Sequence, residues 1–173
     1  MSIIEREAST GDTLFLLGDG LIEKWTFSKY RHVGIVCEKD GEMMVFETDL
    51  WLGKAAFHPL SKYKNKRVVL YETFGLDPDK VKALCRKYEK APYSLLDITT
   101  NFLTGFLHPA IRRPIVGAVG NKKYMICSEL SQRILYEATG LECLKDWESA
   151  EPVDLATTMQ LNHKHFGIKY IQG

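Results

Sequence analysis

The chain has 173 residues, of which 45% are hydrophobic and 26% charged; this excludes intrinsic disorder and predicts a single domain over residues 1–173. Lysine and arginine total 23 against 22 acidic residues, and no predicted element concentrates basic side chains, so nucleic acid is not an expected partner. Acidic residues after Met1 argue against a signal peptide and apolar runs are too short for a transmembrane segment, so we expect a cytoplasmic protein in which any membrane contact is peripheral.

The first half of the chain has the patterns of β-strands. An apolar run at 13–17 has the length of a buried strand. Two further runs flank Asp40-Gly41, a pair that tolerates the positive φ angles of a tight turn, which predicts a β-hairpin. Strands are also expected at 53–58 and 67–72, and the basic run 62–67 is expected to be a solvated loop.

The second half changes to helical spacing. Asp77-Pro78 supplies an N-cap and a first-turn proline, and Pro92 begins a second expected helix that runs to about residue 104. A third helix ends at Gly140, a fourth begins at Pro152, and a last strand is expected at 168–171. The predicted fold class is therefore α+β, with a mostly antiparallel sheet packed against helices.

The spacing of the metal-binding residue types predicts neither a metal site nor a cofactor. His163 and His165 lack a nearby carboxylate or cysteine. The four cysteines contain no CxxC pair and are expected to be free thiols: Cys37, Cys85, Cys127 and Cys143.

Cys127 has the most reactive predicted setting of these thiols. A helix begins at or just after it, and the unpaired N–H groups of a helix N-terminus favour a thiolate. Cys127 also continues the stripe of Leu130, Ile134 and Ala138, so its side chain should face the sheet. The alternative is a small buried core thiol, which is the ordinary role of a cysteine.

The predicted hairpin offers a base and an acceptor for such a thiol. A two-residue turn at Asp40-Gly41 places His32 opposite Asp49 and Gly34 opposite Glu47, so that His32, Glu47 and Asp49 share one face. Glu47 is then diagonal to His32, about 7 Å away between backbones and within side-chain reach. The alternatives are a one-residue slip of the register, or a histidine that is simply a surface or core-edge residue.

These residues resemble the circularly permuted branch of the NlpC-type papain-like cysteine hydrolases, which includes YiiX-like proteins and relatives of lecithin retinol acyltransferase. The resemblance spans about Gly11 to Leu155, and the order of its motifs, with histidine before cysteine, is its most specific mark. The matching segments are Gly11-Asp12, His32-Val33-Gly34-Ile35, Val45-Phe46-Glu47, Pro59-Leu60, Pro92-Tyr93, Cys127-Ser128-Glu129-Leu130 and Pro152-Val153-Asp154-Leu155.

The resemblance implies a thiol hydrolase of peptidase or amidase type that acts on an amide or ester bond. It implies Cys127 as nucleophile, His32 as general base and then acid, and Glu47 as the orienting third residue. Tyr93 and Ser128 are the implied candidates for substrate or oxyanion contacts. The alternatives are an acyltransferase, a non-catalytic module that binds a peptide or lipid on the same fold, and a structural protein with a buried cysteine. The sequence does not choose among peptide, small amide and lipid-ester substrates.

One apolar segment, 101–120, is longer than a plain connection. It is interpreted either as a lid or acyl-binding wall beside Cys127 or as a hydrophobic cluster of the domain's own core. We expect at least one residue between Asn101 and Ile115 to lie within contact distance of the pocket of Cys127.

Overall fold

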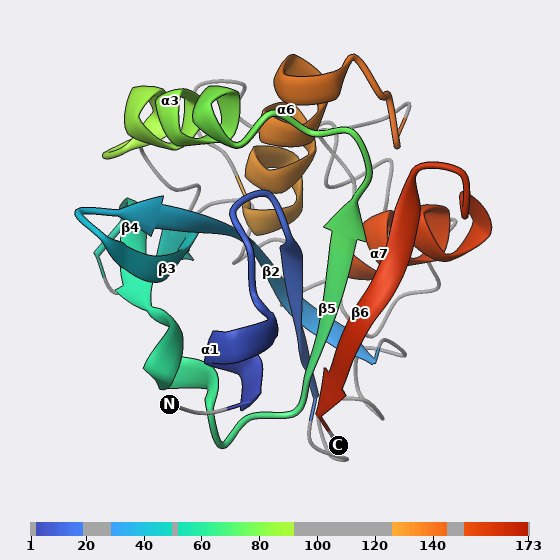
Figure 1. Cartoon of the computed structure of the whole chain (residues 1–173), viewed down its shortest axis with the longest axis horizontal. Coiled ribbons are helices and arrows are strands. Elements are labelled where there is room, and N and C mark those ends of the chain that lie inside the picture. The colour runs from blue at the N-terminus through green and yellow to red at the C-terminus, as the bar shows by residue number, and fades with distance from the viewer. Residues whose placement is uncertain (1–2, 19–28, 50–51, 92–125, 145–150, 173) are drawn as a thin grey trace.

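A six-stranded antiparallel sheet with helical elements on both faces is the framework of the protein, as seen in a computed structural model (Figure 1). The structure describes residues 3–18, 29–49, 52–91, 126–144 and 151–172. It confirms the predicted α+β class. The elements in chain order are α1 (Ile3–Glu7), β1 (Thr13–Leu17), β2 (Tyr30–Lys39), β3 (Glu42–Asp49), β4 (Lys54–Pro59), the 3₁₀ helix η1 (Leu60–Tyr63), β5 (Val68–Thr73), α3 (Pro78–Tyr88), α6 (Cys127–Thr139), α7 (Pro152–Leu161) and β6 (Phe166–Gln172).

The strand order is β4-β3-β2-β1-β5-β6, so β1 and β2 lie at the centre of the sheet. The β2–β3 hairpin has the predicted register, with Val36 opposite Val45. Its turn is made by Asp40 and Gly41, whose φ angles of 54° and 84° are both positive, as a two-residue turn that matches the twist of the strands requires.

Alternate residues of the strands enter two separate hydrophobic clusters, one on each face of the sheet. On the first face, α3, α6 and α7 cover a core that includes Phe15, Val33, Ile35, Phe46, Cys85, Cys127, Leu130, Ile134 and Leu155. On the second face, α1 and η1 cover a smaller core of Ile4, Ala8, Leu14, Val36, Val45, Leu60, Tyr63, Val68 and Leu70.

Helix α6 brings its first residue, Cys127, against the sheet. The chain enters the helix through Ile126, whose backbone is extended, and leaves it at Gly140, whose φ of 77° stops the helix as predicted. The first six residues of α6 are all buried, although four of them are polar or charged. The helix N-terminus therefore lies inside the protein, where its unpaired N–H groups act with little screening.

Most predicted elements are present, with boundaries shifted by up to three residues. Helix α1 was not predicted, because a five-residue helix with one buried residue, Ile4, has no measurable periodicity. The helix expected from Pro92, Tyr93 itself and the apolar segment 101–120 lie outside the described residues. Within the described ranges, no helix is long and apolar enough to cross a membrane.

Candidate active site

The candidate site lies where the pairing of β2 with β3 ends. Their pairing runs from the turn to Ile35 opposite Phe46 and ends there, while β2 stays paired with β1 and β3 stays paired with β4. Gly34 lies just beyond the last pair, and a Cβ on it would lie 2.7 Å from Val45 Cγ1 and 3.1 Å from Glu47 Cβ. The hairpin therefore packs too closely at this point for any side chain larger than glycine.

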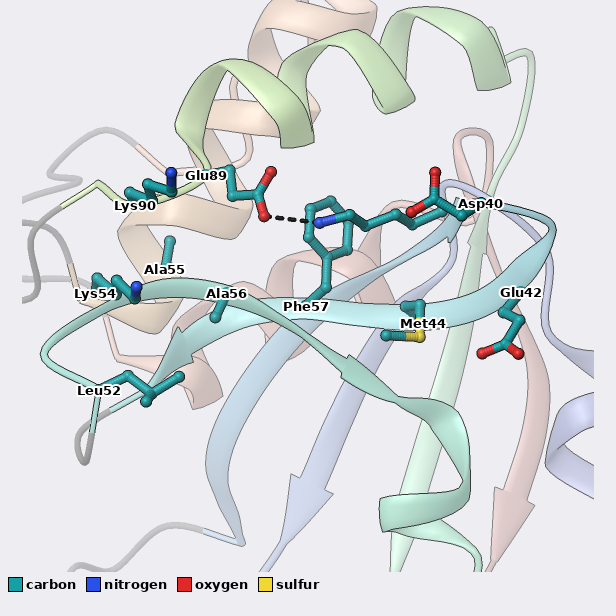
Figure 2. Close-up of a pocket in the computed structure, with 11 residues that line it drawn as sticks. Asp40, Glu42, Met44, Leu52, Lys54, Ala55, Ala56, Phe57, Glu89 and Lys90 are labelled. Carbon is teal, nitrogen blue, oxygen red and sulfur yellow. Dashed lines mark hydrogen bonds and ion pairs between the residues drawn. The ribbon is translucent and has the colours of Figure 1, made fainter.

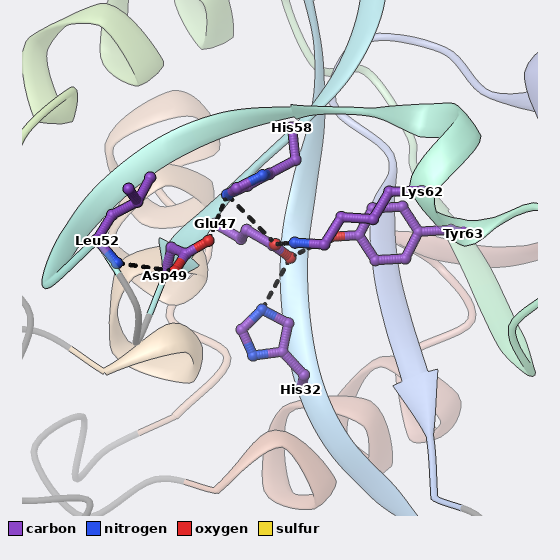
Figure 3. A network of polar contacts seen from close by, with 7 residues as sticks. All are labelled: His32, Glu47, Asp49, Leu52, His58, Lys62 and Tyr63. Carbon is purple, nitrogen blue, oxygen red and sulfur yellow. Dashed lines mark hydrogen bonds and ion pairs between the residues drawn. The ribbon is translucent and has the colours of Figure 1, made fainter.

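His32 and Glu47 meet across this parting of the strands. Nε2 of His32 lies 2.8 Å from Oε2 of Glu47, as the diagonal arrangement predicts (Figure 3). Asp49, the residue directly opposite in the predicted register, has other partners. It lies 2.9 Å from Nε2 of His58 on β4 and accepts a hydrogen bond from the backbone N–H of Leu52. Glu47 is therefore the carboxylate that orients His32.

Two residues of η1 bind the same carboxylate. Nζ of Lys62 donates to Oε1 of Glu47 at 2.7 Å, and the hydroxyl of Tyr63 donates to Oε2 (Figure 3). The expectation that residues 62–67 form a solvated loop is wrong for Tyr63, which is 2% exposed and ends η1. Lys62 is exposed as expected, although its amino group binds Glu47. The signal was available in the pair Leu60 and Tyr63, whose spacing places two apolar groups on one side of a helical turn.

The charge of Glu47 is maintained despite its burial. Burial alone would raise the pKa of this carboxyl, but hydrogen bonds and charge from His32, together with Lys62 and Tyr63, lower it from 4.5 to about 2. Nε2 of His58 lies 3.8 Å from Oε1 and adds a further polar neighbour.

Cys127 and His32 shift each other's pKa toward the charged forms. Burial opposes charge on both, yet the thiolate and Glu47 raise the pKa of His32 from 6.5 to about 10. Burial likewise raises the pKa of Cys127, but the charge and hydrogen bond of His32 and the backbone N–H groups of Val33 and Ser128 lower it overall. The arrangement favours a thiolate facing an imidazolium. Because Nε2 of His32 faces Glu47, Nδ1 is the ring nitrogen left for the thiol.

The site passes through the sheet. Cys127 belongs to the cluster under α3, α6 and α7, whereas Tyr63 belongs to the cluster under α1. His32 joins the two where β2 and β3 no longer pair, with the sulfur within hydrogen-bond reach of the Val33 backbone. Ser128 is fully buried and contributes its backbone N–H to the sulfur.

The other three cysteines have different surroundings. Cys37 on β2 and Cys85 on α3 are buried in the core, as predicted. Cys143 is partly exposed, and burial raises its pKa to about 11. A hydrogen bond with Cys85 and the charges of Lys82 and Arg86 lower the pKa of Cys37 despite its burial. The partner of Cys37 is thus a second thiol, whereas that of Cys127 is the imidazole of His32.

A cavity of about 500 Å³ lies away from this site, near the hairpin turn and the end of α3 (Figure 2). Lys39 crosses it, 4.3 Å from the ring centre of Phe57 and 2.7 Å from Glu89. Its lining contains neither Cys127 nor the residues that bind Glu47.

Comparison with known proteins bears on the fold. The sequence matches no family model, and a search of curated proteins finds no significant match. Among solved structures, the chain is similar to YiiX from Escherichia coli O157:H7, described as a metalloprotein, with a TM-score of 0.55 and 18% identity over 94% of this chain and 89% of that one. The likeness supports the YiiX-like part of the sequence resemblance and the α+β architecture, and at this identity it concerns the fold alone.

Proposed function

We propose that the protein is a cysteine hydrolase of the permuted papain-like type, which cleaves an amide or ester bond through an acyl-enzyme. The observation that carries the proposal is the chain of contacts from Cys127 through His32 to Glu47, in which the thiol and the imidazole share a hydrogen bond and Glu47 lies 2.8 Å from Nε2 of the imidazole. A buried structural thiol needs no such partner, because a neutral thiol packs in a core without the cost of placing two charges in the protein interior.

The reaction begins at the sulfur. The Cys127 thiolate attacks the carbonyl carbon of the substrate, and the electron pair of the C=O bond moves to oxygen. When the tetrahedral intermediate collapses, the carbon–nitrogen or carbon–oxygen bond breaks and the His32 imidazolium gives its proton to the leaving group. The products of this half are a thioester on Cys127, a released amine or alcohol, and neutral His32.

Water completes the cycle. His32 takes a proton from water, the hydroxide equivalent attacks the thioester, and release of the acid restores the thiolate and imidazolium pair. The backbone N–H of Cys127, at the first residue of α6, lacks an acceptor within the helix and is the candidate donor to the oxyanion. Transfer to an acceptor other than water would make the same site an acyltransferase.

The donor set does not fit a metal centre. YiiX is described as a metalloprotein, but the Lys62 ammonium lies 2.7 Å from Oε1 of Glu47, and the Tyr63 hydroxyl and His32 occupy Oε2. Among the residues that the structure describes, no group of three or more histidine, cysteine and acidic side chains is arranged to hold a metal ion. The proposed steps therefore use protein groups alone.

Alkylation and labelling of Cys127 test the proposal. At pH 6.5 iodoacetamide should modify Cys127 faster than the more exposed Cys143, because His32 lowers the pKa of Cys127 whereas burial raises that of Cys143. A panel of amide and ester probes should label the same residue, as located by mass spectrometry, and His32→Ala should abolish labelling. The Cys143→Ser variant serves as the control. Equal rates at the two thiols in the folded protein would contradict the assignment.

A further inference from the structure

The short helix η1 presents two proton donors to a buried carboxylate. Pro59 has extended backbone angles, φ −62° and ψ 139°, and directs the chain into the turn that places Lys62 and Tyr63 beside Glu47. Leu60 and Tyr63 anchor this turn in the core under α1. The side chain of Lys62 is 43% exposed, so its amino group reaches the carboxylate from the solvent edge.

The two oxygens of Glu47 have separate partners. Oε2 accepts from His32 and Tyr63, and Oε1 accepts from Lys62 (Figure 3). The charge of one carboxylate is thus shared between an imidazolium and an ammonium. The titratable groups that face this pair from the neighbouring elements are Cys127 on α6, Asp49 on β3, His58 on β4 and Tyr63 on η1.

A catalytic cycle makes this sharing necessary. Without Lys62, Glu47 would lose its neighbouring cation each time His32 gave its proton to a leaving group, and would remain as a lone charge that is 3% exposed. Such a carboxylate would stabilise the imidazolium over the neutral ring and so oppose the transfer of the proton. The Lys62 ammonium, 2.7 Å from Oε1, offsets the charge of Glu47 in both protonation states of His32. Burial and the charge of Glu47 raise the pKa of Tyr63, so this group stays a neutral donor throughout.

We infer that Lys62 and Tyr63 are positioning residues that keep Glu47 ionised while His32 is neutral, and so set the pH range over which His32 exchanges its proton. The inference rests on the proposed function for its role in turnover. Its effect on His32 is independent of any substrate.

Lys62→Met tests the inference directly. Removal of the positive charge leaves Glu47 a stronger base and lessens repulsion of the imidazolium, so His32 should lose its proton about 1 pH unit higher than in the parent. NMR titration of the His32 ring nitrogens measures this midpoint. With a probe substrate, kcat should fall at unchanged KM, and the alkaline limb of the pH profile should shift upward, because a more tightly held proton is donated less readily.

Matched variants separate this effect from a structural one. Lys62→Arg should restore the parent midpoint, and Lys64→Met, which removes the same charge from an exposed side chain two residues away, should not move it. Tyr63→Phe should shift the midpoint in the same direction by a smaller amount. If Lys62→Met does not fold, as judged by its thermal transition, Tyr63→Phe gives the same reading.

Two results are distinguishable failures. An unchanged His32 midpoint in Lys62→Met, with the fast alkylation of Cys127 intact, overturns the inference and leaves the proposed function standing. An ordinary alkylation rate of Cys127 in the parent overturns the proposed function, and the His32 titration still decides the effect of Lys62.

Discussion

At the scale of single residues, the site distinguishes two neighbouring carboxylates that the sequence presents as near equivalents. Glu47 and Asp49 share a face of β3, but the longer side chain of Glu47 spans the diagonal to His32, and Asp49 pairs with His58 on the next strand. The two side chains differ in length and in their partners, so substitutions of the two residues should have different effects.

Substitution of Glu47 by Gln should remove an acid-dependent part of the stability. The pKa of this carboxyl is about 2 in the folded protein against an ordinary 4.5, so it stabilises the fold above pH 4.5 and that contribution is lost as the pH falls toward 2. Between these values the free energy of unfolding should fall more steeply for the parent than for Glu47→Gln. Urea denaturation at a series of pH values measures the difference.

Asp49→Asn is the matched control for activity. Turnover of a reactive probe should fall in Glu47→Gln, because the imidazolium loses its counter-charge, and should change little in Asp49→Asn. The reverse order would identify Asp49 as the orienting residue.

At the scale of elements, the hairpin was predictable from the sequence, whereas the contacts that η1 makes with it were not. Asp40-Gly41 fixes the turn, the turn fixes the register, and the register places His32 and Glu47 within reach, all from local sequence. The contact of Lys62 with Glu47 depends on how the chain packs after β4, and no short-range pattern encodes it. The ionisation of Cys127 likewise depends on tertiary contact, although its place at a helix start was visible in the sequence.

Gly34→Ala should destabilise the β2–β3 hairpin. Its added methyl group would lie 2.7 Å from Val45 Cγ1 and 3.0 Å from the backbone oxygen of Phe46, so the strands must separate, at a cost of about 1–3 kcal/mol in unfolding free energy. Thermal or urea unfolding measures the loss, and slower alkylation of Cys127 should accompany it. Gly41→Asn, at the open turn where asparagine tolerates a positive φ, should be nearly neutral. A fully stable Gly34→Ala would show that β3 can yield at this point.

At the scale of the whole molecule, the N-terminal helix α1 supports the site through the smaller core on the second face of the sheet. Helix α1 packs with η1 in the smaller core, and η1 carries the partners of Glu47. The beginning of the chain is thus connected to Cys127 through η1, Glu47 and His32, by contacts that start on the opposite face of the sheet.

Ile4→Ala tests this connection. Ile4 is fully buried, and its truncation should reduce the free energy of unfolding by about 2–5 kcal/mol, whereas Ile3→Ala, at a residue 52% exposed, should have little effect. In Ile4→Ala the NMR titration of His32 should also spread over a wider pH range. The reason is that η1, without its contact to Ile4, no longer holds Lys62 and Tyr63 in one position beside Glu47. Loss of stability with an unaltered His32 titration would mean that η1 holds its place without α1.

The end of the β2–β3 pairing has a consequence for how the proposed function could diversify. The sheet separates Cys127, on the side of α6, from Tyr63, on the side of η1. Lys62 and Tyr63 bind Glu47 from η1, so substitutions there can change the charge around His32 while the side chains packed beside the sulfur stay the same. The protonation of the site and the surroundings of the sulfur are therefore open to change on opposite faces of the sheet.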